Sequence, residues 1–365
     1  MIRRSKRIEK KRNWAMLTIT TDDLGGILRD YGVTSPCRGF TELQRYDYED
    51  YDPTGKSVRL IIKAETEDGR AFVVRLKNEE DVTPEIVEAQ SGFAAALRAR
   101  GIETPRVFSS NGRYARQYAI HGYEVTVTVE EFVPRQLQTV DAEAAEKTGR
   151  LLAHMHNIAE EDDLHVENEV LFDPLTWNDL FCFEEFTKHE AFLNDIDSGL
   201  YEAIVLEHEK HEKKLRDLTE PRYAVQGDIS DCNLYVTESG ELGVFDFNRS
   251  GDNVLFFDAV MQAVFEARLM DYPDEISKDP EPVILPAFLR GYTDVRPFSK
   301  AQRECFPCLF ALISAFWLVD LRYGDASLRA AAEGNDREAA RKCMETILAK
   351  LRGAKSVLQT ARDLI

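Results

Sequence analysis

Two short stretches, QGDISDCNL at residues 226–234 and VFDF at residues 244–247, decide the expected fold of this chain. Asp228 and Asn233 stand five residues apart on a loop that enters the apolar run 234–236. Asp246 follows Asn233 by thirteen residues, at the end of the apolar run 242–245. If the two runs pair as a β-hairpin, Asn233 and Asp246 meet at the same end of the ladder.

The residue types at that end of the hairpin indicate a chemistry. An amide oxygen from Asn233 and a carboxylate oxygen from Asp246 suit a hard cation such as Mg²⁺, which takes few protein ligands beside nucleotide phosphates. Asp228 beside them can accept a proton from the hydroxyl group of an acceptor molecule. A surface hairpin with turn-favouring Asp and Asn is the alternative, but agreement of all three residues at this spacing by chance is uncommon.

The spacing of these residues equals that of the catalytic loop and metal-binding aspartate of kinases. The segment resembles the superfamily of aminoglycoside phosphotransferases, choline kinases and homoserine kinases, whose loop is usually HGDxxxxN. The superfamily's downstream pattern is matched at Asp246-Phe247, Gly251-Asp252 and Asp258. Its upstream pattern, which runs from Gly to His, is matched by GRLLAHMH at 149–156, where we expect a structural role for His156. The resemblance extends over roughly residues 57–260.

The resemblance implies an α+β, protein-kinase-like fold with a small antiparallel β-sheet N-lobe and a larger, mostly helical C-lobe. It divides the chain into a basic tail at 1–16, a nucleotide-binding lobe at 17–133 and a catalytic and substrate-binding lobe at 134–365. It also implies transfer of the γ-phosphoryl group of ATP to a hydroxyl group of a small metabolite. In that reaction Asp228 is the catalytic base, and Asn233 and Asp246 are the ligands of Mg²⁺.

Sequence patterns predict the same order of elements. Runs rich in Val, Ile and Phe at 58–65 and 70–77 flank TEDG at 66–69, a hairpin signal because Asp-Gly tolerates positive φ. A helix is expected to open at Thr83-Pro84 and to stop at Gly101. Further elements are expected as strands at 114–120 and 124–132, helices at 141–158 and 180–215, a strand-rich segment at 223–247, and helices from there to the end.

The first lobe offers candidate nucleotide ligands. GRAFVVRL at 69–76 resembles the superfamily's "GRxYVLRL" strand, whose basic residue reaches the nucleotide phosphates. This nominates Arg75, with Lys77 as the alternative because both side chains point to the same face of the strand. The resemblance further implies a helix carboxylate that pairs with this basic residue. Glu88 is the candidate for that role, and Glu85 is the alternative.

The resemblance also implies an adenine site, and the sequence departs from the superfamily's pattern in two places. VEEFVP at 129–134 resembles the hinge whose backbone binds adenine, which nominates Glu131 and Val133. Gln226 stands where the superfamily usually has His, and an amide can still hydrogen-bond a carbonyl group. The first hairpin, expected around 46–56, contains only Gly55, so no glycine-rich phosphate loop is visible.

Composition limits the other classes of function. The net charge is −19, and the one basic cluster is the tail at 3–12, which argues against a nucleic-acid surface. The longest apolar run, Cys305 to Val319, is short for a membrane span and predicts a buried helix. Six scattered cysteines and no export signal favour a cytoplasmic protein. The oligomeric state stays open.

The acceptor stays open as well. An acidic chain favours cationic ligands, so an amino sugar, an amino alcohol or an aminoglycoside is the first candidate. A homoserine-kinase-like enzyme that acts on a free amino acid is an alternative, as is a nucleotide-binding pseudokinase with a structural or regulatory role. ATP is the expected co-substrate, and the sequence leaves GTP open.

Overall fold

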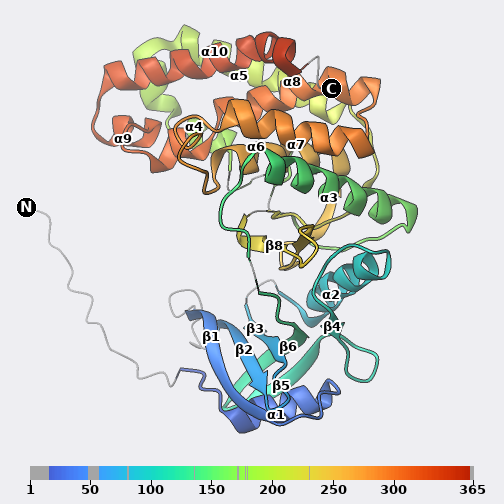
Figure 1. Cartoon of the computed structure of the whole chain (residues 1–365). Coiled ribbons are helices and arrows are strands. Elements are labelled where there is room, and N and C mark those ends of the chain that lie inside the picture. The colour runs from blue at the N-terminus through green and yellow to red at the C-terminus, as the bar shows by residue number, and fades with distance from the viewer. Residues whose placement is uncertain are drawn as a thin grey trace, which may run out of the picture. The chain divides into compact units, whose positions relative to one another are not determined.

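The computed structural model describes residues 16–47, 57–79, 82–134, 136–170, 172–176, 178, 180–229 and 231–361. It divides into two compact units (Figure 1). The sheet unit comprises Met1–Ser91 and Arg106–Phe132, and the helical unit comprises Gly92–Pro105 and Val133–Ile365. Within the described part of the chain, no helix has both the length and the hydropathy needed to cross a membrane.

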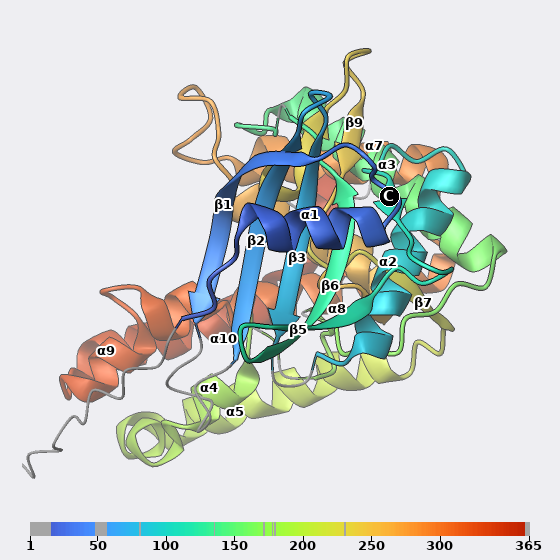
Figure 2. The ribbon, with the colours of Figure 1, turned by 90° about the horizontal axis from the view of Figure 1, so that it is seen from below.

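The sheet unit contains an antiparallel sheet in the order β1-β2-β3-β6-β4, with β5 paired to β6. Helix α1 (Thr21–Asp30) lies across one face of this sheet (Figure 2). The capping box between Thr20 and Asp23 starts α1, and this signal was missed in the sequence. The strands are β1 (Cys37–Asp47), β2 (Val58–Thr66), β3 (Ala71–Asn78), β4 (Val107–Phe108), β5 (Arg116–Ile120) and β6 (Tyr123–Glu131).

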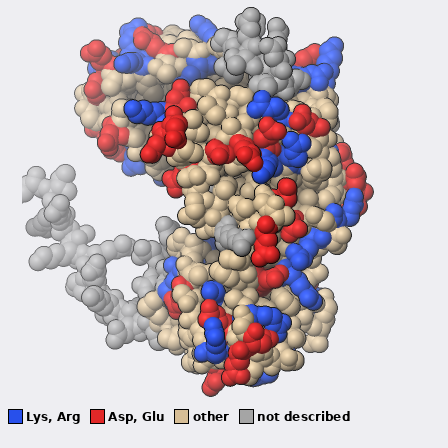
Figure 3. All heavy atoms as spheres, in the orientation of Figure 1, with Lys and Arg blue, Asp and Glu red and all other residues tan. Residues whose placement is uncertain are grey.

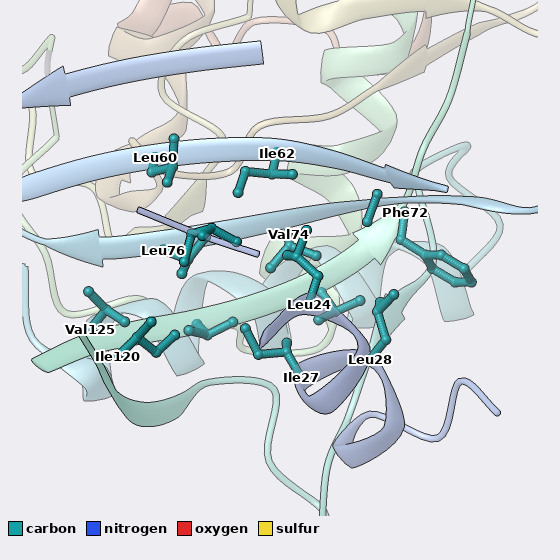
Figure 4. Close-up of a cluster of buried hydrophobic side chains, with 14 of the residues drawn as sticks. Leu24, Ile27, Leu28, Leu60, Ile62, Phe72, Val74, Leu76, Ile120 and Val125 are labelled. Atoms are coloured by element: carbon teal, nitrogen blue, oxygen red, sulfur yellow. The ribbon is translucent and has the colours of Figure 1, made fainter. Parts of the chain in front are cut away.

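Alternation along β3 separates its two faces. Phe72, Val74 and Leu76 belong to the core cluster, together with Leu24 and Ile27 of α1 (Figure 4). Arg75 and Lys77 occupy the intervening positions, so their side chains lie on the opposite face of the sheet. The predicted hairpin between β2 and β3 is confirmed, with Gly69 at φ +84° in its turn.

Helix α2 (Pro84–Ala99) begins where the sequence predicted it. The hydroxyl group of Thr83 accepts a hydrogen bond from the N–H of Ile86 at 3.3 Å, as expected of a capping residue. The first half of α2 belongs to the sheet unit, and its second half, from Gly92, belongs to the helical unit.

The helical unit follows the predicted α-rich pattern and contains two short two-stranded sheets. The predicted buried helix over Cys305 to Val319 is confirmed as far as Ala315, where α8 ends, and Val319 is exposed. Its helices are α3 (Ala142–Glu161), α4 (Phe183–Thr187), α5 (Glu190–Arg216), α6 (Leu255–Arg268), α7 (Glu281–Val295), α8 (Lys300–Ala315), α9 (Leu328–Glu333) and α10 (Arg337–Ala361). Its strands are β7 (Arg222–Val225), β8 (Leu234–Val236), β9 (Leu242–Val244) and β10 (Gly251–Val254).

Charged side chains of both signs are interspersed on the face of the molecule shown in Figure 3. In the helical unit, charged side chains pair within one helix at i,i+4 spacing, as Lys147 does with Glu143 and Arg329 with Glu333, both at 2.9 Å. The acidic excess of the chain therefore does not form a single-sign field over this face.

Helices α3 and α7 approach each other closely through two glycines. A Cβ atom built on Gly149 would lie 2.0 Å from the carbonyl oxygen of Phe288. A Cβ atom on Gly291 would lie 1.9 Å from the carbonyl oxygen of Glu146. At each glycine, the backbone of the other helix thus occupies the space that a side chain would need.

We expect Gly149→Ala to lower the free energy of unfolding by about 1–3 kcal/mol, because the new methyl group forces the two helix backbones apart. The matched control is Gly92→Ala in α2, where the new Cβ atom would have no atom within 4 Å beyond its chain neighbours and the backbone of its own helix. The control should be neutral or stabilising by up to about 1 kcal/mol. Urea unfolding of both variants measures the difference, and equal effects would contradict the close approach.

His208 lies within an aromatic cluster of the helical unit. Its ring stacks on Phe183 with 3.6 Å between centroids, and it meets the edge of Phe316 at 5.4 Å. Burial in this cluster lowers the pKa of His208 to about 4, against the opposing effect of Glu212. The folded protein therefore keeps this ring neutral at a pH where the unfolded chain protonates it.

This shift predicts a loss of stability in acid. Below about pH 6.5 the unfolded chain binds a proton at His208 that the folded protein does not bind until about pH 4, so stability falls across this window by up to about 3 kcal/mol. His208→Phe preserves the ring stacking and should flatten the curve of unfolding free energy against pH. Parallel curves for the wild type and the variant between pH 7 and pH 4 would contradict the shift.

Candidate functional site

The hairpin predicted around Asn233 and Asp246 is present. β8 and β9 pair antiparallel with Leu234 opposite Val244, and the N–H of Phe245 donates to the carbonyl oxygen of Asn233 at 2.9 Å. Asn233 precedes β8 in a short 3₁₀ turn, and Asp246 follows Phe245. The ladder therefore places Asn233 and the segment around Asp246 at one end of the hairpin, as the spacing predicted.

Asp246 has an unusual backbone conformation. Its φ of +60° lies in the left-handed region, which residues other than glycine rarely occupy. Asn248 holds its carboxylate: both the backbone N–H of Asn248, at 3.4 Å, and its side-chain amide donate to Oδ1. Such a conformation persists only where its surroundings enforce it, and it is common at functional sites.

The loop between Asp228 and Asn233 is closed by the Asn233 amide. Its Nδ2 donates to the carbonyl oxygen of Asp228 at 2.7 Å and to Oδ2 of the same residue at 3.3 Å. Asn233 is itself buried. Because the amide nitrogen faces Asp228, the amide oxygen of Asn233 faces away from that carboxylate.

Gln226 connects this loop to the segment that carries Asp246. Its Oε1 accepts the N–H of Asp228 at 2.8 Å, and its Nε2 donates to the carbonyl oxygen of Asp246 at 2.9 Å. The residue is fully buried, so both ends of its amide are engaged away from solvent. Gln226 thus hydrogen-bonds a carbonyl group, as the sequence analysis expected, and it also accepts the N–H of Asp228.

A buried chain of hydrogen bonds holds the loop from the other side. Oε1 of Gln262 in α6 accepts the N–H of Ile229 at 3.1 Å, and Nε2 of Gln262 donates to Oδ1 of Asp258 at 3.3 Å. Oδ2 of Asp258 lies 3.0 Å from Nε2 of His156 in α3, whose Nδ1 lies 2.8 Å from the hydroxyl group of Tyr292 in α7. All five residues are at most 1% exposed. Burial lowers the pKa of His156, although Asp258 opposes this shift.

His156 therefore has the structural role expected from the sequence. It connects α3 to α6 and α7 through its two ring nitrogens. His154, two residues earlier on the same helix, is exposed. The two rings diverge, and they do not form a metal-binding pair.

In the sheet unit, Arg75 is paired with a carboxylate that the sequence comparison did not nominate. Its Nε and Nη2 both donate to Oε1 of Glu130 in β6, at 3.0 Å and 2.8 Å. The side chains of Arg75 and Glu130 are only 8% and 17% exposed. This ion pair is therefore largely shielded from solvent.

The expected pairing of Arg75 with Glu88 is wrong. The carboxylate of Glu88 in α2 instead accepts the backbone N–H of Ala115 at 2.7 Å, which ties the helix to the start of β5. Glu85, the alternative, is exposed on the first turn of α2. Lys77 lies on the same face of β3 as Arg75, as the alternation predicted, and its side chain is buried.

The expected hinge begins where β6 ends. The N–H of Glu131 donates to the carbonyl oxygen of Arg106 at 2.9 Å, and the next N–H, that of Phe132, donates to Ala71 at 3.1 Å. Val133 is the first residue of the helical unit after the sheet. Its N–H makes no hydrogen bond to any residue that the structure describes.

The sequence comparison missed two residues, Gln262 and Glu130. Gln262 lies one helical turn after Asp258, and this i,i+4 spacing was the available signal. Glu130 faces the same side of the sheet as Arg75, but this depends on the β3–β6 register, which sequence patterns did not determine.

Comparisons with known proteins agree with this fold. A family model described as the phosphotransferase enzyme family matches residues 59–299. The structure of an amicoumacin kinase, hAmiN, in complex with AMP-PNP, Ca²⁺ and Ami is similar at a TM-score of 0.54 and 14% identity, over 89% of this chain and 93% of that chain. The structure of a microcompartment-associated aminopropanol kinase is similar at a TM-score of 0.51 and 15% identity, over 83% of this chain and 90% of that chain.

No curated protein gives a significant sequence match. The two structural similarities support the predicted fold, with its antiparallel sheet unit and its helical unit. The family match covers well over half of the sequence and includes residues of both units. The chain therefore belongs to the phosphotransferase enzyme family, and it is a phosphotransferase that acts on hydroxyl groups.

Proposed function

We propose that this enzyme transfers the γ-phosphoryl group of ATP, bound with Mg²⁺, to a hydroxyl group of a small molecule that carries an amine. The observation that carries the proposal is the linked geometry of Asp228, Asn233 and Asp246. Asn233 contacts Asp228 directly, and Gln226 connects the backbones of Asp228 and Asp246. A base and two oxygen ligands held as one unit suit in-line phosphoryl transfer, where positioning supplies most of the catalysis.

Asp228 is the catalytic base in this proposal. Its carboxylate accepts the hydroxyl proton of the acceptor or orients that hydroxyl for attack on the γ-phosphorus. The Asn233 amide, 3.3 Å from Oδ2, fixes the orientation of the carboxylate. Gln226 and Gln262 hold the peptide groups on either side of Asp228, so the base keeps its position when the acceptor binds.

Asn233 and Asp246 would hold the magnesium ion, and the residues fit this group. The Asn233 amide nitrogen is engaged with Asp228, which leaves the amide oxygen as the donor on its other side. Asp246 adds a carboxylate. Among the described residues there is no cluster of three or more His, Cys, Asp or Glu that could hold a metal, and Mg²⁺ in nucleotide sites needs only one or two protein ligands. When bound, the ion neutralises negative charge on the phosphates.

Arg75 is the proposed contact to the nucleotide phosphates, with Lys77 as the neighbouring cation on the same face of β3. The backbone around Glu131 and Val133 is the proposed adenine site. The Arg75 guanidinium group suits contact with phosphates because it stays charged and offers several N–H donors in a fixed plane. The cationic face balances the charge of a triphosphate.

An amine-bearing acceptor is supported by two observations. The chain has a net charge of −19, which favours cationic ligands. One of the two similar structures is, by its name, an aminopropanol kinase, so an enzyme of similar fold takes an amino alcohol. A panel of amino alcohols, amino sugars, aminoglycosides and free amino acids, assayed by ADP release, tests this class.

The central test separates the base from the metal ligands. Asp228→Asn should leave Mg-ATP affinity nearly intact and lower turnover by roughly 10²–10⁴. Asp246→Asn should remove the Mg²⁺-dependent part of ATP affinity, measured by calorimetry with and without chelator. Asp279→Asn, at an exposed position of the helical unit, is the control. Wild-type protein that binds ATP but phosphorylates nothing in the panel would contradict the proposed acceptor class.

A second test addresses the link through Gln226. Gln226→Met should lower the free energy of unfolding by about 1–3 kcal/mol, because it leaves the Asp228 N–H and the Asp246 carbonyl without their partner. Turnover should fall more than the folded fraction does. The control is Gln138→Met at an exposed position. Normal turnover in folded Gln226→Met would show that the link does not serve catalysis.

A further inference from the structure

We infer that Glu130 is a positioning residue for nucleotide binding, which orients Arg75 from within the sheet in place of a helix carboxylate. This inference rests on the proposed role of Arg75 toward the nucleotide phosphates. It concerns how the arginine is held.

The geometry of the pair restricts the arginine. Nε and Nη2 of Arg75 contact the same oxygen, Oε1 of Glu130, at 3.0 Å and 2.8 Å. Engagement of this edge fixes the plane of the guanidinium group and turns its Nη1 side away from Glu130. Both side chains are largely buried, so the pair is weakly screened by water and salt.

The sheet register holds both partners. Arg75 lies opposite Thr128, and Val73 lies opposite Glu130, so the two charged residues are diagonal neighbours on one face of adjacent strands. β6 is paired with β3 along one edge and with β4 and β5 along the other. The ion pair therefore sits on the interior strands of the sheet, where the backbone is held on both sides.

The helix carboxylate has a different partner. Glu88 of α2 accepts the N–H of Ala115, a contact that joins helix to strand within the sheet unit. No ion pair between Glu88 and Arg75 occurs in the described structure. The pair that orients Arg75 therefore includes no residue of α2.

Two effects of Glu130 on an anionic ligand oppose each other. Its negative charge repels phosphate, whereas its hydrogen bonds hold the guanidinium in one orientation. The variants Glu130→Gln and Glu130→Ala separate them. The glutamine removes the charge and keeps an acceptor oxygen, whereas the alanine removes both.

The experiment measures the affinity of the full chain for Mg-ATP and for adenosine, which lacks phosphates. Glu130→Ala should weaken ATP binding at least tenfold and change adenosine binding less than threefold, and Glu130→Gln should recover most of the ATP affinity. The matched control is Glu124→Ala, an exposed glutamate of β6 that should bind ATP like the wild type. Tighter ATP binding by both Glu130 variants would overturn the inference, because charge repulsion would then dominate.

A double-mutant cycle tests whether Glu130 acts through Arg75. If it does, Glu130→Ala should cost less than threefold further in ATP affinity once Arg75→Ala is present. Equal losses in both backgrounds would overturn the inference, as would a tenfold loss in Glu88→Ala beside none in Glu130→Ala. Failure of the proposed function has a different signature: wild-type protein without ATP binding, or Arg75→Ala with full ATP affinity.

Discussion

The loop that carries Asp228 depends on buried side-chain amides for its backbone hydrogen bonds. Asp228 and Ile229 lie between β7 and β8, outside both strands, so no ladder pairs their peptide groups. The side-chain oxygen of Gln226 accepts a hydrogen bond from the N–H of Asp228, and that of Gln262 accepts one from the N–H of Ile229. The Asn233 amide donates to the carbonyl oxygen of Asp228. An unpaired buried peptide group is costly, so these amides select one conformation of the loop.

This dependence explains the packing around the loop. The amide of Gln262 accepts the N–H of Ile229 with its oxygen and donates to Asp258 with its nitrogen. The buried carboxylate of Asp258 also needs a partner, and the ring of His156 provides it. His156 in turn reaches Tyr292 on α7, and α7 crosses α3 at the distance that Gly149 and Gly291 permit. The close helix crossing and the candidate active site are thus parts of one buried network, so a change at the crossing can shift Asp228, the proposed base.

Local patterns predicted much of this fold because the signals are short in sequence. The β2–β3 turn, the Thr83 cap and the hairpin around Asn233 and Asp246 each depend on a few neighbouring residues. The partner of Arg75 could not be predicted in this way, because it is set by the register between β3 and β6, and 44 residues lie between the end of β3 and the start of β6. The pairing of β7 with β10 was missed for the same reason. Helix α1 was missed although its capping box is local, because a ten-residue helix with two glycines has a weak propensity.

Gln226 also has a consequence for how the loop responds to acidity. An imidazole in its place would exchange an acceptor for a donor when it binds a proton, and the hydrogen bond to the Asp228 N–H would then be lost. A carboxamide has no proton to gain or lose in the physiological range, and its acceptor and donor ends stay distinct. Protonation at position 226 therefore cannot change the hydrogen bonds that link Asp228 and Asp246. The pH dependence of the reaction is then set by the ionisation of Asp228, the proposed base, and of the bound ligands.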